Sequence, residues 1–284
     1  MTRIAGMGSA AVAVLIGLAA CAFDRISGGT GAGNPPQADV ALSFQASSSV
    51  TPAIAAEALA RASAASFAHA AQGPTVRNPD GTFSVADSSG TPLKLTAISV
   101  KVGRIDFKLP VGLTCAQVVG LPCVDDEASV KGPYAMDLMS GQAVPSINFI
   151  KLPEGLYHDF GLEVPQGATD TGTNMFIRGE AELPGGKSPF ELRLDLRDGV
   201  DFLDSAGVPI SADAINRLVL SLGVDGWFAG VDVRRCLEDT SGAVVESGAR
   251  ILLGDTACGG TGLRIRRNIE ASTDVENNED AGNP

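Results

Sequence analysis

The sequence predicts an all-β protein, an antiparallel β-sandwich with one alanine-rich helical insertion. Apolar and polar residues alternate in several short segments, as in strands that have one buried and one wet face. The clearest of these segments is the row Phe190, Leu192, Leu194 and Leu196. Glycine is abundant, with 34 residues, and only 19% of residues are charged, which favours strands and turns over long solvated helices. A turn pattern, Asp-x-x-Gly, suits type I turns and recurs at 87–90, 204–207 and 239–242.

The first residues indicate export. Arg3 precedes an apolar run that ends in Leu18-Ala19-Ala20-Cys21, and such a run is typical of a secretory signal. The ending resembles the lipobox of bacterial lipoproteins. The resemblance implies that residues 1–20 are a lipoprotein signal peptide and that Cys21 is lipidated, and two or more acyl chains give a stable membrane anchor. It also implies an outer-membrane location, because residue 22 is Ala and not the Asp that commonly retains such proteins at the inner membrane. An ordinary signal peptide with a chance cysteine, or an uncleaved helix, is the alternative.

Lipidation of Cys21 leaves an even set of cysteines: Cys115, Cys123, Cys236 and Cys258. Export permits disulfides, and four cysteines allow three pairings. We favour Cys115–Cys123, which closes a short loop, and Cys236–Cys258, which closes a hairpin-sized one. A metal site is the competing interpretation. The chain has no Cys-x-x-Cys, and neither histidine is near a cysteine in sequence, so we expect no metal and no cofactor.

Composition divides the mature chain into four parts. Residues 21–37 are rich in Gly and Pro and are predicted to be a tether; a phosphate-binding loop is not expected there, because no strand precedes it and no Lys-Ser/Thr follows. Residues 38–269 form the β-sandwich domain, with two sub-sandwiches that break near 184–186 as an alternative. The alanine-rich insertion, 48–72, is a helix or a disordered segment. Residues 270–284 are expected to be an acidic disordered tail.

Individual elements follow from periodicity. One predicted strand, 93–109, carries apolar residues of both parities: Ile98, Val100 and Val102, and then Ile105, Phe107 and Leu109. One extra residue restores the apolar face, so we predict a β-bulge near Gly103-Arg104. A short helix is expected over 263–269. The other predicted strands are 39–47, 134–139, 157–164, 176–181, 190–197, 218–224 and 249–253.

Residues 137–157 carry a second resemblance. An apolar strand ends in Asp-Leu-x-Ser-Gly, and Leu152-Pro153-x-Gly155-x-Tyr157 then opens another strand. This order resembles a domain of unknown function that recurs in exported bacterial lipoproteins, an uncharacterised family with a transthyretin-like or immunoglobulin-like β-sandwich. The similarity covers roughly residues 93–225. It implies the fold and carries no catalytic residues.

Motifs of catalysis are missing from the sequence. There is no Gly-x-Ser-x-Gly, no His-Glu-x-x-His and no phosphate-binding Gly-x-x-x-x-Gly-Lys-Ser/Thr. Of the two histidines, His69 lies in the insertion and His158 is predicted at the rim of the core. Glu180 and Glu182 are candidates for paired carboxylates, but they also read as the wet face of a strand. The net charge of −12 disfavours nucleic-acid binding. We therefore expect that the protein is not an enzyme.

Three functions are compatible with these observations. The first is a lipid-anchored cell-envelope lipoprotein with a non-enzymatic structural or interaction role, whose partners are the membrane and an envelope protein or a glycan. The second is a carbohydrate-binding module in which Trp227 and Phe228, flanked by glycines, form a ligand platform; the competing interpretation of this pair is a packing anchor. The third is a glycan hydrolase.

Overall fold

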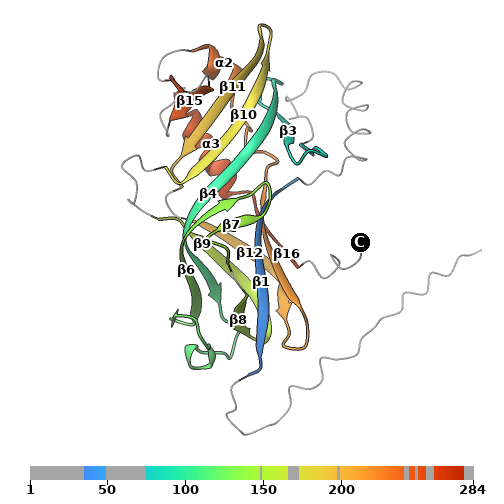
Figure 1. Cartoon of the computed structure of the whole chain (residues 1–284), viewed down its shortest axis with the longest axis vertical. Coiled ribbons are helices and arrows are strands. Elements are labelled where there is room, and N and C mark those ends of the chain that lie inside the picture. The colour runs from blue at the N-terminus through green and yellow to red at the C-terminus, as the bar shows by residue number, and fades with distance from the viewer. Residues whose placement is uncertain are drawn as a thin grey trace, which may run out of the picture. The chain divides into compact units, whose positions relative to one another are not determined.

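The computed structural model confirms a mostly β, largely antiparallel protein (Figure 1). It describes residues 35–48, 75–147, 149–165, 173–196, 199–239, 243–246, 249–253 and 259–277. These residues all belong to one compact unit, Pro35–Pro284. Residues 49–72 of the predicted insertion, 21–34 of the predicted tether and 278–284 lie outside the described ranges.

The smaller sheet has four strands in the order β16-β13-β1-β8. Its strands are β1 (Gln37–Ser47), β8 (Ile150–Pro153), β13 (Asn216–Gly223) and β16 (Thr273–Asn277). β1 and β13 run parallel, whereas the other two pairs are antiparallel. The prediction of a purely antiparallel fold is therefore wrong for this pair. Residues so distant in sequence are joined by a long crossover, which permits a parallel ladder.

The larger sheet is organised around β4 (Pro92–Lys108). The first half of β4 pairs with β10 and β3, and its second half pairs with β9 and β6. A further parallel pair joins β11 to β15. The remaining strands of this sheet are β2 (Val76–Arg77), β3 (Phe83–Ala86), β5 (Cys123–Val124), β6 (Glu127–Asp137), β7 (Gln142–Val144), β9 (Gly155–Glu163), β10 (Met175–Leu183), β11 (Gly186–Leu194), β12 (Val200–Ile210), β14 (Ala243–Glu246) and β15 (Ala249–Leu253).

The predicted bulge in β4 is confirmed. The register between β4 and β6 shifts between Val102 and Arg104. Val102 and Ile105 are consequently both fully buried, although they have opposite parity. The same point separates the β10-paired half of β4 from the β9-paired half, so this one irregularity lets a single strand serve two sets of neighbours.

Two predicted boundaries are wrong. The suggested break at 184–186 is the turn of a hairpin, because Leu183 pairs with Gly186 at the end of the β10–β11 ladder. The predicted disordered tail begins too early, because β16 (Thr273–Asn277) pairs antiparallel with β13. An edge of β13 without a partner would leave a row of backbone groups unpaired, and this pairing outweighs the acidic composition.

Short helices complete the domain. The predicted helix exists as α3 (Thr261–Glu270), and its Ile265 and Ile269 are fully buried. A second helix, α2 (Val233–Glu238), was not predicted; Asp232 caps its start, and the Asp232 side chain accepts a hydrogen bond from the Arg235 amide. The 3-10 turn η1 (Cys115–Gln117) lies in the loop after β4. One hydrophobic core takes side chains from both sheets and both helices.

Candidate functional site

The cysteine predictions are confirmed in part. Cys115 and Cys123 form a disulfide with a Cα–Cα distance of 5.3 Å. Cys236 is also disulfide-bonded, but its predicted partner, Cys258, lies outside the described residues. The predicted lipidation site, Cys21, lies outside them too.

The predicted ligand platform is wrong. Trp227 is 0% exposed and Phe228 is 1% exposed, so neither ring can stack on a ligand from solvent. The indole Nε1 donates a hydrogen bond to Ser272 Oγ at 2.8 Å, and Asn268 Nδ2 donates to the Trp227 carbonyl at 3.0 Å. Both partners flank the end of α3. Trp227 therefore fixes the end of α3 to the turn that follows β13, and both rings are packing residues of the core.

The other polar candidates are also on ordinary surface. His158 is exposed and not at the rim of the core, and its Nδ1 donates to the Asp204 carbonyl at 2.9 Å. The prediction fails because Tyr157 and Phe160 are both buried, which breaks the alternation along β9. Glu180 pairs with Lys187 at 3.3 Å across the β10–β11 hairpin, as expected for the wet face of a strand.

The Leu-Pro-x-Gly-x-Tyr turn lies at the end of the domain where β1 begins. Leu152 and Tyr157 are fully buried, and the Tyr157 hydroxyl donates to the Pro153 carbonyl at 2.9 Å. A Cβ on Gly155 would lie 2.7 Å from Pro110 Cγ, so only glycine allows the turn to pack against the loop that follows β4. The motif therefore joins β8, β9 and this loop.

The first described residues are attached to the same turn. The Glu154 amide donates to the Pro36 carbonyl at 2.9 Å, and Gln37 Nε2 donates to the Gln117 carbonyl at 2.9 Å. The Ala212 amide donates to Glu154 Oε2 at 3.3 Å. We call these segments, residues 35–37, 109–126, 153–156 and 211–215, the proximal end (Figure 1).

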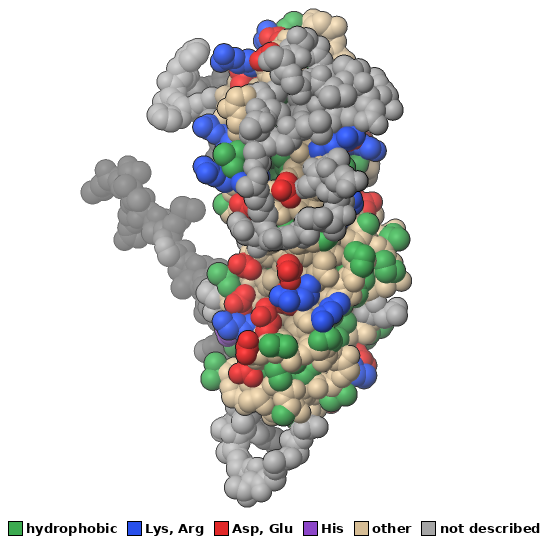
Figure 2. Space-filling view, turned by 90° about the vertical axis from the view of Figure 1, so that its left-hand side faces the viewer, with side chains coloured by type: hydrophobic (Ala, Val, Ile, Leu, Met, Phe, Trp, Pro, Cys, Tyr) green, Lys and Arg blue, Asp and Glu red, His purple; other side chains and the backbone are tan. Residues whose placement is uncertain are grey.

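An acidic groove lies beside the end of β4. It has a volume of about 440 Å³, and the acids that line it are Asp125, Glu127, Asp159 and Asp201. Lys108, the one basic residue in the lining, lies 3.7 Å from Asp159. Figure 2 shows acidic and basic side chains gathered across the lower part of the face that it draws.

A buried aspartate adds to the charge near this groove. Asp106 is 5% exposed, and Arg104 Nε donates to its Oδ2 at 2.8 Å. Burial raises the pKa of Asp106, although Arg104 opposes the shift. Loss of hydration, and then the charge of Asp106, raise the pKa of Glu127. A Cβ on Gly161 would lie 3.5 Å from Asp106 Cβ and 3.7 Å from Asp201 Oδ1, so this glycine leaves open space between the two acids.

Sequence reasoning did not find this groove, because its acids come from separate strands and a turn that only the fold brings together. One signal was present: Asp106 is an acid between Ile105 and Phe107, in a segment that is otherwise apolar. A charge at such a position is seldom buried without a partner.

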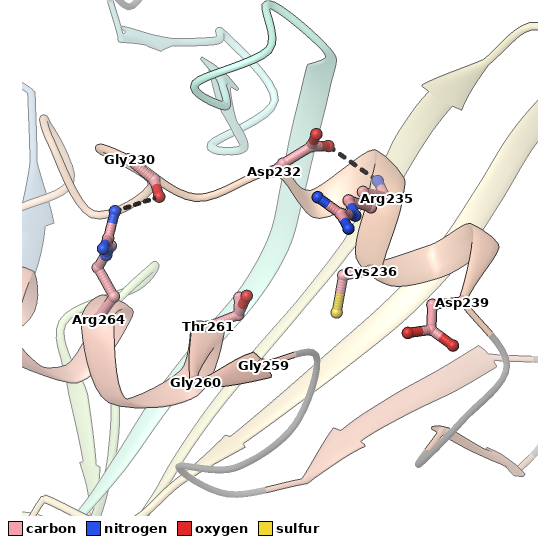
Figure 3. A pocket seen from close by; sticks show the side chains of 9 residues that line it. All are labelled: Gly230, Asp232, Arg235, Cys236, Asp239, Gly259, Gly260, Thr261 and Arg264. Atoms are coloured by element: carbon pink, nitrogen blue, oxygen red, sulfur yellow. Dashed lines mark hydrogen bonds between the residues drawn. The ribbon is translucent and has the colours of Figure 1, made fainter.

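A second pocket lies between α2 and α3 (Figure 3) and has a volume of about 400 Å³. Arg235 and Arg264 reach it, as do Asp232 and Asp239. Arg264 Nη1 donates to the Gly230 carbonyl at 2.7 Å. The two arginines and two aspartates of the pocket lining balance in formal charge, so the lining offers no excess of either sign to a charged ligand.

Comparison with known proteins gives no guide to function. No protein-family model, no curated protein and no solved structure matches the chain. Among the described residues, no three His, Cys, Asp or Glu side chains are placed to hold a metal ion. Within the same ranges, neither helix has the length and apolar character that crossing a membrane requires.

Proposed function

We propose that the protein is a lipoprotein of the bacterial outer membrane, exported by residues 1–20 and anchored by acyl chains on Cys21. Its β-domain has a structural or interaction role without catalysis, toward an envelope protein or a glycan and not toward nucleic acid. The observation that carries the proposal is the sequence Leu18-Ala19-Ala20-Cys21, which stands fourteen positions before the compact unit begins at Pro35.

Two features of the domain support export. The Cys115–Cys123 disulfide closes the loop after β4, and Cys236 is bonded as well. Such bonds persist in oxidising compartments and are rare in the cytosol.

The two sheets and the Leu-Pro-x-Gly-x-Tyr turn support a transthyretin-like or immunoglobulin-like type for the domain, and we include that type in the proposal.

The anchor is tested in bacteria that express the native chain and a Cys21→Ser variant. We expect the mass of the native amino-terminal peptide to show acylation of Cys21, and the native protein to fractionate with outer membranes. The variant should lose both properties. If the Cys21→Ser variant still fractionated with outer membranes, the proposed lipid anchor would be contradicted.

The interaction role is tested by crosslinking whole envelopes and purifying the native protein and the Cys21→Ser variant side by side. A partner that is recovered with the native protein and depleted with the variant supports the role. If the native protein captures no partner and its deletion leaves the envelope intact, the role is wrong.

One observation favours a second function, glycan hydrolysis. The acidic groove combines Glu127, whose pKa is raised, with Asp159 and Asp201, and glycoside hydrolysis needs a protonated acid beside a second carboxylate. The native protein is incubated with envelope polysaccharides, and reducing ends are measured. Glu127→Gln should abolish any release, while Glu180→Gln, on the wet face of β10, should not change it. Absence of release by the native protein counts against this function.

A further inference from the structure

Exposed apolar side chains surround the place where the described chain begins. Val111 and Val119, in the loop after β4, are 106% and 48% exposed. Leu156, in β9, is 41% exposed, and Ile215, in the turn before β13, is 84% exposed. Single exposed apolar residues are common on soluble proteins, whereas a group of them marks a contact surface.

These four residues come from three connections that are separate in the sequence but fixed to one another. Gly155 packs against Pro110, the neighbour of Val111. Glu154 Oε2 accepts a hydrogen bond from Ala212, in the turn that carries Ile215. The disulfide between Cys115 and Cys123 closes the segment that contains Val119. The apolar residues therefore belong to one braced surface and not to three independent loops.

The charge of the proximal end indicates which kind of partner surface this end can bind. No Asp, Glu, Lys, Arg or His occurs from Leu109 to Val124. The charged residues elsewhere in the proximal end are all acidic: Asp125, Asp126, Glu154 and Asp213. Anionic lipids attract basic segments, so an acidic rim disfavours them. The surface fits a neutral apolar partner.

The length of the preceding chain brings this surface to the membrane. Pro35 follows Cys21 by fourteen positions, and fourteen residues span at most about 50 Å. Because the lipid anchor already holds the protein at the bilayer, a second contact between the domain and that bilayer has a high effective concentration. Even a weak apolar contact is then populated.

We propose that the proximal end is a bilayer-docking face, in which Val111, Val119, Leu156 and Ile215 rest in the interface of a zwitterionic membrane. This inference rests on the lipid anchor proposed above. The Pro36–Glu154 and Gln37–Gln117 hydrogen bonds tie the start of the domain to the docking loops. Docking would thus fix the orientation of the whole β-domain toward the bilayer.

The test places a tryptophan on the docking face. Val111→Trp is combined with phosphatidylcholine vesicles that carry bromine on their acyl chains. Contact that is about 5–10 Å deep should lower the added emission about twofold and shift it to the blue. Ile215→Trp repeats the test on a different connection. The matched control is Val144→Trp. Val144 is an exposed valine of β7, which pairs with β6 outside the proximal end, and a tryptophan there should not be quenched. The native Trp227 is buried and gives a constant background.

Two ways of anchoring separate this inference from the proposed function. One sample is the protein made in bacteria. The other is the chain from Cys21 onward, which keeps every described element, with the Cys21 thiol coupled to a maleimide lipid. Quenching only in the coupled sample supports docking and contradicts natural lipidation. Equal emission from Val111→Trp, Ile215→Trp and Val144→Trp in the coupled sample would overturn docking. Phosphatidylglycerol should weaken the quenching; a stronger signal would contradict the proposed zwitterionic partner.

Discussion

Asp87, in the turn between β3 and β4, accepts a hydrogen bond at 2.8 Å from the backbone amide of Val233, the first residue of α2. The other carboxylate oxygen of Asp87 accepts from the amides of Ser89 and Thr91, at 2.9 Å and 2.8 Å. Ser88 adds a bond from its hydroxyl to the Val231 carbonyl at 2.7 Å. One turn thereby closes on itself and also holds the start of a helix that is 146 positions away.

Asp87→Ala should destabilise the domain by about 3–5 kcal/mol, because several buried amides lose their acceptor at once. Urea unfolding measures the change. The matched control is Asp204→Ala, which removes the same Asp-x-x-Gly interaction, with the Ala206 amide at 2.8 Å. That site is exposed and holds no helix, so it should lose only about 1 kcal/mol. Equal losses at the two sites would show that the contact with α2 contributes nothing.

The two Asp-x-x-Gly segments show what sequence can and cannot predict. Local chemistry predicts the turn in both, because an aspartate oxygen accepts bonds from amides two or more residues ahead. At 87–90 the turn joins two strands, as expected. At 204–207 it interrupts the pairing of β12 with β9, between Leu203 and Val208. Whether a turn ends a strand or bulges within it depends on the neighbouring strand, which local sequence does not specify.

The same limit applies to the candidate sites. The bulge in β4 was predictable, because apolar residues of both parities occur in one strand. The burial of Trp227 was not, since an aromatic flanked by glycines looks alike in a binding platform and in a packing anchor. The acidic groove depends on Glu127, Asp159 and Asp201, which come from three strands. Only the strand order brings them together, and strand order is set by long-range packing.

The turn between β5 and β6 offers a stabilising substitution. Asp125 and Asp126 both have positive φ, 52° and 60°, as a two-residue type I′ hairpin turn requires. Asp126→Gly should raise the free energy of unfolding by about 0.5–1 kcal/mol, because glycine adopts this conformation without strain. Asp213→Gly, in the turn before β13, is the control and should be neutral or destabilising. Loss of stability in Asp126→Gly would show that the aspartate makes a compensating contact.

The buried hydroxyl of Tyr157 should make the fold less stable at alkaline pH. Burial raises the pKa of its hydroxyl above the ordinary value of 10.0. The hydroxyl therefore contributes its full stabilisation below pH 10. This stabilisation is lost as pH rises toward the pKa that Tyr157 has in the folded state, because in that range the tyrosine ionises only in the unfolded chain. Tyr157→Phe should cost about 1–2 kcal/mol near pH 8, where the Pro153 carbonyl loses its donor. The difference from the native chain should shrink above pH 10. Urea unfolding at both pH values checks this, and a constant difference would contradict it.

Glu191 should make the stability of the fold depend on pH in the opposite direction, with stability lost as pH falls. This glutamate of β11 is 5% exposed, and it accepts hydrogen bonds from Arg178 Nε and, at 2.6 Å, from Arg193 Nε. Burial alone would raise its pKa, but the two guanidinium groups outweigh burial and lower the pKa of Glu191 below its ordinary value. Its contribution to stability is therefore present above the unfolded-state pKa and is lost as pH falls through the folded-state pKa.

Glu191→Gln removes this titration. We expect the variant to be less stable at pH 7 by about 1–2 kcal/mol, a modest value because Arg178 is largely exposed and its ion pair is screened. Between pH 5 and pH 3 it should lose less stability than the native chain, so the two should converge. Glu180→Gln, whose partner Lys187 is exposed, is the control and should change stability by less than about 0.5 kcal/mol at either pH. Urea unfolding at pH 7 and at pH 3.5 gives both comparisons. If Glu191→Gln lost as much stability on acidification as the native chain, other carboxylates would be responsible for the acid sensitivity of the fold.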